Sequence, residues 1–399
     1  MVQQIKQSIL NPVSHQIQLI ATTAFGLEAI AAREIKALGY DVLETENGRI
    51  TFAGSPEAIC RANLWLRTAE RVLLKVGGFN ARSFEELFEK TKALPWSQWI
   101  PENGVFPVSG KSIKSQLSSV PDCQAIVKKA VVESLKKKYQ CDWFEEKGSQ
   151  FAIEAALLKD RVTLTIDTSG SGLHRRGYRE SYHQAPLKET LAAAMVMLSY
   201  WNPSRVLVDP FCGSGTIPIE AALIGRNIAP GMKREFVSQR WDWIDPTLWR
   251  QARKETHDLA DFTRPIQIQG YDIDEKSVRM ARAYAFNALD AHDIHFERRD
   301  VADLGSRYHY GCVITNPPYG ERMGSEEELE RLYRTMADRF FRLDSWSVYV
   351  LTAYSALEHI FGKKADRRRK LYNGRIMCQY YQYQGPRPPR RETGGEAEK

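Results

Sequence analysis

The chain has 399 residues, of which 43% are hydrophobic and 26% are charged, and its formal net charge is +7. This length predicts two or three globular domains rather than one core. No apolar run approaches the roughly 20 residues that cross a bilayer, and the first residues lack a signal-peptide core. The six cysteines form no CxxC pair, which argues against a metal site and a disulfide framework. We therefore expect a cytoplasmic protein that binds neither a membrane nor a metal.

The N-terminal residues predict a small α+β unit. Strands at 17–22, 40–44 and 49–52 alternate with helices at 26–38 and 55–69, and Asn47-Gly48 is a strong hairpin signal. Further on, we expect strands at 71–79 and 105–108, helices at 83–94 and 122–139, and a hairpin of 151–158 with 161–167. Nothing in 1–167 resembles a catalytic constellation. Its lysines and hydroxyl side chains favour phosphate binding, although a solvated helix face explains them equally well.

The pattern changes after Ser169-Gly170-Ser171-Gly172, which is typical of a linker. Strands and helices then alternate regularly, and such alternation predicts a doubly wound, Rossmann-like parallel sheet. The predicted elements are a helix at 187–200, a strand at 205–208, a helix at 217–225, a strand at 266–271, a helix at 275–289, strands at 294–298 and 312–315, a helix at 326–342 and a strand at 345–352.

The stretch Asn316-Pro317-Pro318-Tyr319 follows a buried strand, so it is expected at the carboxyl edge of the sheet, where α/β proteins bind ligands. Two prolines make the loop stiff and leave carbonyl oxygens as acceptors. An asparagine oxygen, a rigid carbonyl and an aromatic face form a socket for a planar group that bears an NH2. The alternative is an ordinary surface turn, because Asn and Pro are common in turns.

A second motif, Asp209-Pro-Phe211-Cys-Gly213-Ser-Gly215-Thr, leads from a strand through a Gly-rich turn into a helix. No lysine follows the last glycine, which excludes a P-loop, and Pro218 replaces the third glycine of a dinucleotide fingerprint. An acid beside the turn would repel a pyrophosphate. It suits the cationic amino-acid part of a sulfonium ligand.

Two further acids follow the next two strands. Asp272 is placed to bind ribose hydroxyls, and Asp300 to accept from an adenine amine. Each of them alone could be a helix cap or a surface residue. Between Gly215 and Asp272 lies an insertion at 226–265, rich in Trp and Arg, which is either near the substrate entrance or a structural elaboration.

Basic residues gather near the C-terminus. We interpret them as a phosphate-contacting surface, with a solvated tail as the alternative. They are Lys363, Lys364, Arg367, Arg368, Arg369, Lys370 and Arg375, followed by Arg387, Arg390 and Arg391.

Together these motifs resemble the S-adenosylmethionine-dependent amino methyltransferases. The strings at 173–178, 209–222, 228–231 and 316–324 are similar to one branch, the THUMP-containing ribosomal RNA guanine-N2 methyltransferases. The resemblance extends to about residue 385. It implies a ferredoxin-like segment at 1–65, a THUMP RNA-binding domain at 66–168, a methyltransferase domain at 169–385 and a disordered tail at 386–399. Larger relatives carry a second methyltransferase domain, which we do not expect here.

The resemblance also implies roles for single residues. Asn316, Pro317 and Tyr319 would hold and stack a base, and its amine would take a methyl group from S-adenosylmethionine. The substrate would be RNA, most simply 23S ribosomal RNA, and guanine rests on the resemblance alone. Protein glutamine-N5 and nucleic-acid adenine-N6 methyl transfer stay open as alternatives, and the oligomeric state is not indicated. The implied cofactor-binding residues are Asp209, Phe211, Gly213, Gly215, Asp272 and Asp300.

Overall fold

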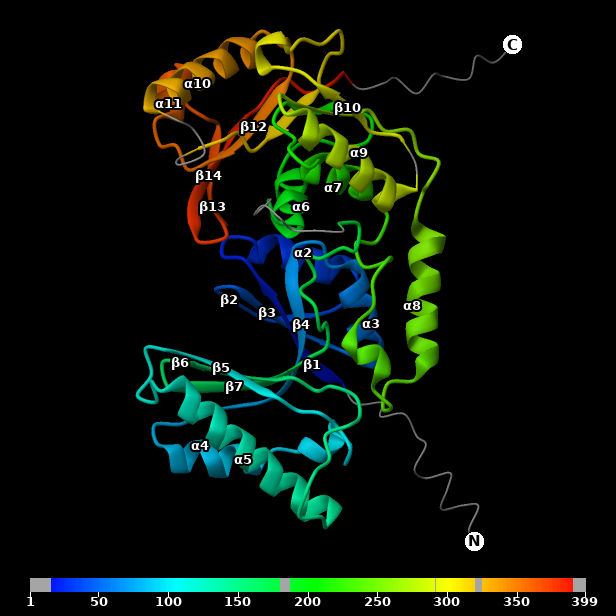
Figure 1. Cartoon of the computed structure of the whole chain (residues 1–399), viewed down its shortest axis with the longest axis vertical. Helices are drawn as coiled ribbons and strands as arrows, with labels where there is room; N and C mark the ends of the chain where they lie inside the picture. Colours follow the sequence, from blue (N-terminus) through cyan, green and yellow to red (C-terminus); the bar gives the residue numbers. More distant parts are fainter. Residues whose placement is uncertain (1–15, 180–186, 291, 320–324, 390–399) are drawn as a thin grey trace, which may run out of the picture. The chain divides into compact units, whose positions relative to one another are not determined.

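The structure, a computed structural model, describes residues 16–179, 187–290, 292–319 and 325–389. The chain divides into two compact units. The first contains the residues up to Arg176 together with Ala229–Leu259, and the second contains Gly177–Ile228 together with the chain from Ala260 onward (Figure 1). The chain therefore enters the second unit, returns to the first and leaves it again. The four domain boundaries expected from the sequence stay a prediction.

The first unit is built on one seven-stranded sheet with the order β2-β3-β1-β4-β7-β6-β5. The long strand β4 pairs with β1 and with β7, so it belongs to both halves of the sheet. The strands are β1 (Ile17–Thr23), β2 (Val42–Glu46), β3 (Arg49–Gly54), β4 (Ala69–Asn80), β5 (Val108–Ile113), β6 (Ile153–Leu158) and β7 (Arg161–Asp167). The helices are α2 (Glu28–Ala37), α3 (Pro56–Trp65), α4 (Phe84–Lys92), α5 (Val120–Tyr139) and α8 (Pro246–Leu259), with 3-10 turns η1 (Trp96–Gln98) and η2 (Val237–Arg240).

Most of these elements agree with the sequence prediction, but helix α8 was not predicted and one strand differs. The strand expected at 105–108 is displaced, because Val105 forms only an isolated bridge and β5 begins at Val108. β5 is the edge strand and pairs in parallel with β6. Half-buried and exposed residues alternate along β5, and none of them is fully buried. An edge strand of this kind has no continuous apolar run, so the sequence does not reveal where it begins.

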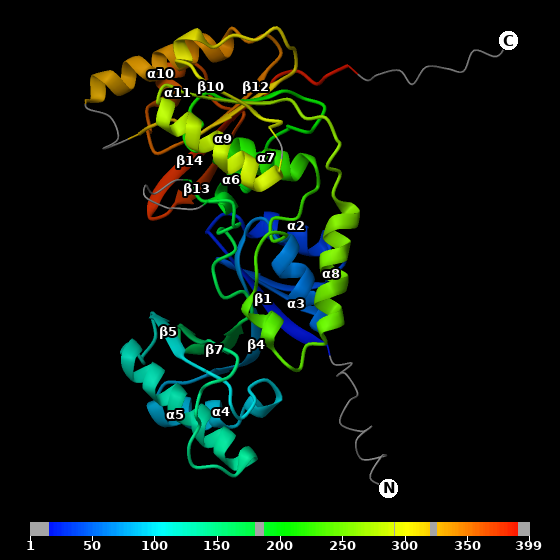
Figure 2. The ribbon, with the colours of Figure 1, turned by 45° about the vertical axis from the view of Figure 1, so that its right-hand side comes forward.

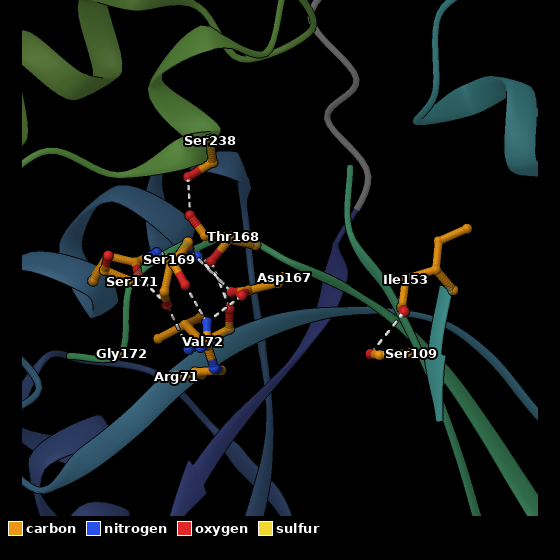
Figure 3. A network of polar contacts seen from close by, with 12 residues as sticks. Arg71, Val72, Ser109, Ile153, Asp167, Thr168, Ser169, Ser171, Gly172 and Ser238 are labelled. Carbon is orange, nitrogen blue, oxygen red and sulfur yellow. Dashed lines mark hydrogen bonds and ion pairs between the residues drawn. The ribbon is translucent and has the colours of Figure 1, made fainter. Parts of the chain in front are cut away.

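The segment expected to be a linker is anchored in the first unit (Figure 3). Ser169 is buried, receives the Val72 amide at 2.9 Å and donates to Asn63 Oδ1 at 2.6 Å. The guanidinium of Arg71 binds both Asp167 and the Gly170 carbonyl. The linker interpretation is therefore wrong for this stretch, since its small polar residues supply a hydrogen-bond network.

The insertion at 226–265 also contributes to the first unit. Trp241 stacks on Phe151 with ring centroids 4.9 Å apart, and Trp249 stacks on Phe236 at 5.3 Å. Both tryptophans are buried in the core of that unit. Glu255 on α8 pairs with Arg61 at 2.7 Å. These contacts support the interpretation of the insertion as a structural elaboration.

The second unit contains a seven-stranded sheet with the order β10-β9-β8-β11-β12-β14-β13. Five strands are parallel, and β14 and β13 add an antiparallel edge. Helices α10 and α11 cover one face and α6, α7 and α9 the other (Figure 1, Figure 2). The strands are β8 (Leu207–Asp209), β9 (Ile268–Asp272), β10 (His295–Arg298), β11 (Cys312–Thr315), β12 (Ser347–Thr352), β13 (Arg367–Asn373) and β14 (Ile376–Tyr383). The helices are α6 (Glu189–Met197), α7 (Thr216–Gly225), α9 (Glu275–Leu289), α10 (Glu326–Phe341) and α11 (Leu357–Phe361), with a 3-10 turn η3 (Val301–Asp303).

The sheet confirms the Rossmann-like prediction except at the antiparallel edge formed by β14 and β13. The basic cluster at 363–375, for which a solvated tail was an alternative, contains strand β13, paired with β14 throughout its length. Only the parallel elements were expected, because the strongly charged β13 has no apolar alternation. The predicted disordered tail at 386–399 falls mostly outside the described residues.

Three further properties hold for the described ranges. All six cysteines are free. No described helix is long and apolar enough to cross a membrane. Within the same ranges, no group of three or more His, Cys, Asp or Glu side chains could hold a metal ion.

Candidate active site

The predicted site residues gather at one edge of the second unit's sheet. Val208 in β8 pairs with Val313 in β11, so Asp209, which ends β8, and Asn316, which follows β11, lie at the ends of neighbouring parallel strands. Asp209 also pairs with Gly270 in β9, two residues before Asp272. Parallel strands bring their carboxyl ends to the same edge, where ligands bind in this type of sheet.

Asp209 is 1% exposed at the end of β8. Its Oδ1 accepts from the Phe211 amide at 3.1 Å and from Thr315 Oγ1 at 2.6 Å. Burial raises the pKa of Asp209 to about 7, although both hydrogen bonds oppose this shift and the charge of Asp272 adds to it. A buried carboxyl with this pKa binds a cation more strongly once it is ionised.

The Gly-rich turn is bound to these acids through its backbone. The Gly213 amide donates to Asp272 Oδ2 at 2.9 Å, with a left-handed φ of +52°. Gly215, the residue before α7, has φ +81°, and a Cβ there would lie 3.0 Å from Ala281 Cβ and Phe296 Cζ. Position 215 therefore requires glycine, whereas at Gly213 another residue meets only backbone strain. The amides of Phe211, Gly213 and Gly215 all donate within the protein, and the Gly213 amide holds the Asp272 carboxyl at the turn.

Asp272, the last residue of β9, and Asp300, two residues after β10, have different surroundings. Asp272 is partly buried, its Oδ1 accepts from the Asp274 amide at 2.9 Å, and burial raises its pKa. Asp300 is exposed, and its Oδ1 accepts from the Ala302 amide at 2.9 Å, so this side chain caps η3. Asp300 thus has the capping role that was its alternative interpretation, and binding of an adenine amine stays a prediction.

Asn316 has the most unusual polar atom of the site. Its Oδ1 is buried and has no hydrogen-bond partner among the residues that the structure describes. A buried acceptor without a donor costs about 1–3 kcal/mol, and such atoms are rare in folded proteins. This oxygen is therefore suited to a donor that arrives with a ligand.

The rest of the tetrapeptide is held from two directions. The Tyr333 hydroxyl of α10 donates to the Pro318 carbonyl at 3.2 Å. The Tyr319 hydroxyl accepts from Asn373 Nδ2 at 2.9 Å and from Cys378 Sγ at 3.6 Å, both in the β13–β14 hairpin. The Tyr319 ring is 5% exposed, so stacking on a base requires part of its cover to move.

Sequence reasoning missed four residues that support the site. Thr315 bonds Asp209, Tyr333 bonds Pro318, and Asn373 and Cys378 bond Tyr319. A threonine at the end of a buried strand, next to Asn316, was a usable signal. So was the Asn373-Gly374 dipeptide, which is a hairpin signal. Nothing in the sequence pattern distinguishes Tyr333 from an ordinary core tyrosine.

Comparison with known families agrees with this geometry. Residues 176–382, more than half of the chain, match the family described as the RMKL-like methyltransferase domain. The chain belongs to this family. Residues 18–73 match the RlmL ferredoxin-like domain, and residues 81–167 match the THUMP domain. The family predicted from the sequence motifs is thereby confirmed.

Individual relatives are similar over most of this chain. "Putative RNA methyltransferase YpsC" of Bacillus subtilis is 51% identical over 378 residues, covering 94% of this chain and 98% of the relative. "Ribosomal RNA large subunit methyltransferase K/L" of Syntrophotalea carbinolica is 36% identical, and this chain covers 53% of it. This chain thus spans about half the length of the K/L relative.

Two solved structures have similar folds. One, described as "a predicted N6-adenine-specific DNA methylase" from Listeria monocytogenes, has a TM-score of 0.89 and 53% identity, covering 93% of this chain and 97% of that one. The other, "SMU.472, a putative methyltransferase complexed with SAH", has a TM-score of 0.90 and 41% identity, covering 94% of this chain and 100% of that one.

The cofactor of this methyltransferase is S-adenosylmethionine. The site residues fit this molecule. Asp209 is a buried carboxyl that can ionise near neutral pH, which suits a cationic group, and Asp272 retains lone pairs for hydroxyl donors. The unpartnered Asn316 oxygen lies at the same sheet edge, where the methyl acceptor is needed.

Proposed function

We propose that this protein transfers the methyl group of S-adenosylmethionine to the exocyclic N2 amine of a guanine in RNA, with 23S ribosomal RNA as the substrate and the cytoplasm as the place of action. The observation that carries the proposal is Asn316 Oδ1, a buried acceptor without a described partner at the carboxyl edge of the sheet. An aromatic amine supplies the N–H donor that this oxygen lacks.

The residues of the tetrapeptide act on the amine before and during methyl transfer. S-adenosylmethionine supplies an electrophilic methyl group on a sulfonium. The lone pair of a base amine is delocalised into the ring, so it is a poor nucleophile. Asn316 Oδ1 and the Pro317 carbonyl accept its two N–H bonds and favour a tetrahedral nitrogen with its lone pair directed at the methyl. The same oxygens would stabilise the positive charge that the nitrogen gains. As the N–C bond forms, the C–S bond of the sulfonium breaks and S-adenosylhomocysteine leaves. The methylated nitrogen then loses one N–H proton to solvent and becomes neutral.

Positioning supplies much of the acceleration in this scheme, so no basic or nucleophilic side chain is needed. Tyr333 holds the Pro318 carbonyl and Asn373 holds Tyr319, which keeps the acceptor oxygens in place. We assign Tyr319 to contact with the base plane. The target nucleotide must leave any helix to enter such a socket.

The relatives support RNA as the substrate class. The THUMP match and two relatives named as RNA or ribosomal RNA methyltransferases agree with it. A second candidate, adenine-N6 methyl transfer, is favoured by the name of the Listeria structure. A glutamine amide of a protein offers the same NH2 group and forms the third chemistry to be tested.

Mass spectrometry of the methylated product separates these candidates. The purified protein is incubated with labelled S-adenosylmethionine and transcribed 23S RNA, DNA or total protein, and the products are digested to nucleosides or amino acids. We expect N2-methylguanosine. N6-methyladenosine, or label in glutamine, would overturn the proposal.

Asn316→Ala tests the role of the asparagine. Loss of a transition-state acceptor lowers kcat by about 100-fold or more, by analogy with oxyanion-hole donors. S-adenosylmethionine affinity, measured by calorimetry, is expected to stay unchanged. Asn202→Ala is a matched control, because Asn202 is exposed and its side chain bonds only Ser204 among the contacts described. Equal rates of the Asn316 variant and this control would contradict the role.

A further inference from the structure

The β13–β14 hairpin extends past the sheet on the side where the site lies. β12 ends at Thr352, which pairs with Gln379 of β14. The residues from Leu371 to Cys378 are therefore beyond the last pair with β12. Because β12 runs parallel to β11, its C-terminal end is at the same edge as Asn316. The hairpin tip thus projects from the ligand-binding edge (Figure 1).

A side-chain contact joins this tip to the socket. Asn373, the last residue of β13, donates to the Tyr319 hydroxyl at 2.9 Å. Asn373 pairs directly with Ile376 across the turn. The exposed turn is therefore adjacent to Asn373, which itself contacts Tyr319 of the candidate socket.

The tip has the chemistry of a nucleic-acid contact. All of its residues from Gly374 to Met377 are exposed, and Ile376 and Met377 are 49% and 50% exposed. Arg375 is the basic residue of the tip, and the other basic residues of the hairpin, Arg367 to Lys370, lie in the part of β13 that is away from the turn. From Arg367 to Gln384 the chain has no Asp or Glu. An exposed arginine binds phosphate, and protruding Ile or Met side chains pack between bases that have lost a stacking neighbour.

We propose that the tip of the β13–β14 hairpin contacts the substrate RNA beside the target nucleotide, with Arg375 on the phosphate backbone and Ile376 and Met377 against the flanking bases. This inference rests on the proposed function, because it takes RNA as the substrate. A base that leaves its stack exposes apolar faces of its neighbours. Two apolar side chains next to the socket cover those faces while the base is held.

The test uses the full-length protein and transcribed 23S RNA, with Ile376→Gln/Met377→Gln and Arg375→Gln as variants. Met280→Gln and Arg279→Gln are controls, since both residues are exposed on α9. We expect the double variant to lower kcat/KM for RNA by about tenfold, which corresponds to about 1.4 kcal/mol. Arg375→Gln is expected to weaken RNA binding in filter assays and to reduce the salt slope by about 1. S-adenosylmethionine affinity stays at the wild-type value.

The outcomes separate this inference from the proposed function. Wild-type protein that methylates RNA, with tip variants as active and as tightly bound to RNA as the controls, overturns the hairpin inference alone. Tip variants that lose S-adenosylmethionine affinity also overturn it, because the tip would then be structural. Wild-type protein that methylates only DNA or protein overturns the proposed function itself.

Discussion

At the scale of single residues, the site combines a carboxyl that has hydrogen-bond partners with an amide oxygen that has none among the described residues. Asp209 is buried and accepts two hydrogen bonds, whereas Asn316 Oδ1 is buried without a described donor. The first arrangement can be maintained with or without a ligand. The second is costly until a donor arrives, and for that reason it directs substrate binding rather than folding.

The raised pKa of Asp209 predicts a pH dependence of cofactor binding. This carboxyl has an ordinary pKa of 3.8 and a folded pKa of about 7, so its ionised fraction rises through neutral pH. We expect S-adenosylmethionine affinity to increase between about pH 6 and about pH 8, because the ionised form attracts a cation. Calorimetric titration of wild type and Asp209→Asn measures this, and the variant should bind weakly with no such increase.

The same residue changes stability in the absence of cofactor. Between the two pKa values the folded protein holds a proton that the unfolded chain has released. The contribution of Asp209 to the free energy of unfolding is therefore full near pH 4 and falls as the pH rises to about 7. In urea unfolding, Asp209→Asn should show a smaller decrease over this window. If neither the cofactor affinity nor the stability of the wild-type protein changes with pH, the raised pKa of Asp209 is contradicted.

Asn373 predicts a coupling with the tyrosine that it touches. If Asn373 acts through the Tyr319 hydroxyl, Asn373→Ala lowers kcat in wild type by several-fold and has little further effect in Tyr319→Phe. The four proteins of this cycle are compared for kcat at saturating S-adenosylmethionine. Additive losses would mean that the contact is not used for positioning.

At the scale of elements, sequence reasoning found the parallel sheet because its signals are local. Buried strands such as 312–315 and the Gly-rich turn after Asp209 have apolar and glycine patterns that predict their structure directly. Strand β13 was not predicted, because it begins with four consecutive basic residues, a pattern that fits a strand at a sheet edge and gives no apolar signal. Whether Arg367–Lys370 form a strand depends on β14, which is a tertiary contact.

For the candidate site too, the sequence predicts residues with local signals and misses those that depend on tertiary contacts. The common location of Asp209, Asp272 and Asn316 was predicted because each lies at the end of a strand that parallel pairing brings to one edge. The residues that hold Tyr319 come from the hairpin, 54 and 59 residues later in the chain, and no spacing rule predicts them.

The turn of this hairpin gives a prediction at the element scale. Gly374 is the first residue of a two-residue turn between Asn373 and Ile376 and has φ +63°. A Cβ meets no neighbour there, so substitution costs only backbone strain. We expect Gly374→Ala to destabilise the hairpin by about 1–2 kcal/mol and to reduce methyl transfer. Glycine at 362 is a matched control with the same φ at the end of α11. Equal transfer rates for Gly374→Ala and Gly362→Ala would contradict the importance of the turn.

At the scale of the whole molecule, the return of Ala229–Leu259 to the first unit decides how the protein can be divided. This segment contributes Trp241, Ile244 and Trp249 to the first unit's core. A fragment that begins at residue 177 retains these side chains and loses the partners that bury them.

We predict that such a fragment aggregates and binds hydrophobic dyes, and that replacing 229–259 by a short Gly-Ser linker relieves both effects. A short linker suffices because the Asp261 amide bonds the Arg226 carbonyl at 2.8 Å. Light scattering and dye fluorescence of the two fragments measure the difference. Equal behaviour would show that the segment does not need the first unit.

The returning segment also determines the order of folding during synthesis. When residue 176 leaves the ribosome, the first unit still lacks η2 and α8, including the tryptophans that close its core. By the time these arrive, β8 and α7 of the second unit have already been made. The nascent chain therefore carries two unfinished hydrophobic cores together, a period in which a chaperone that shields apolar surface would be of most use.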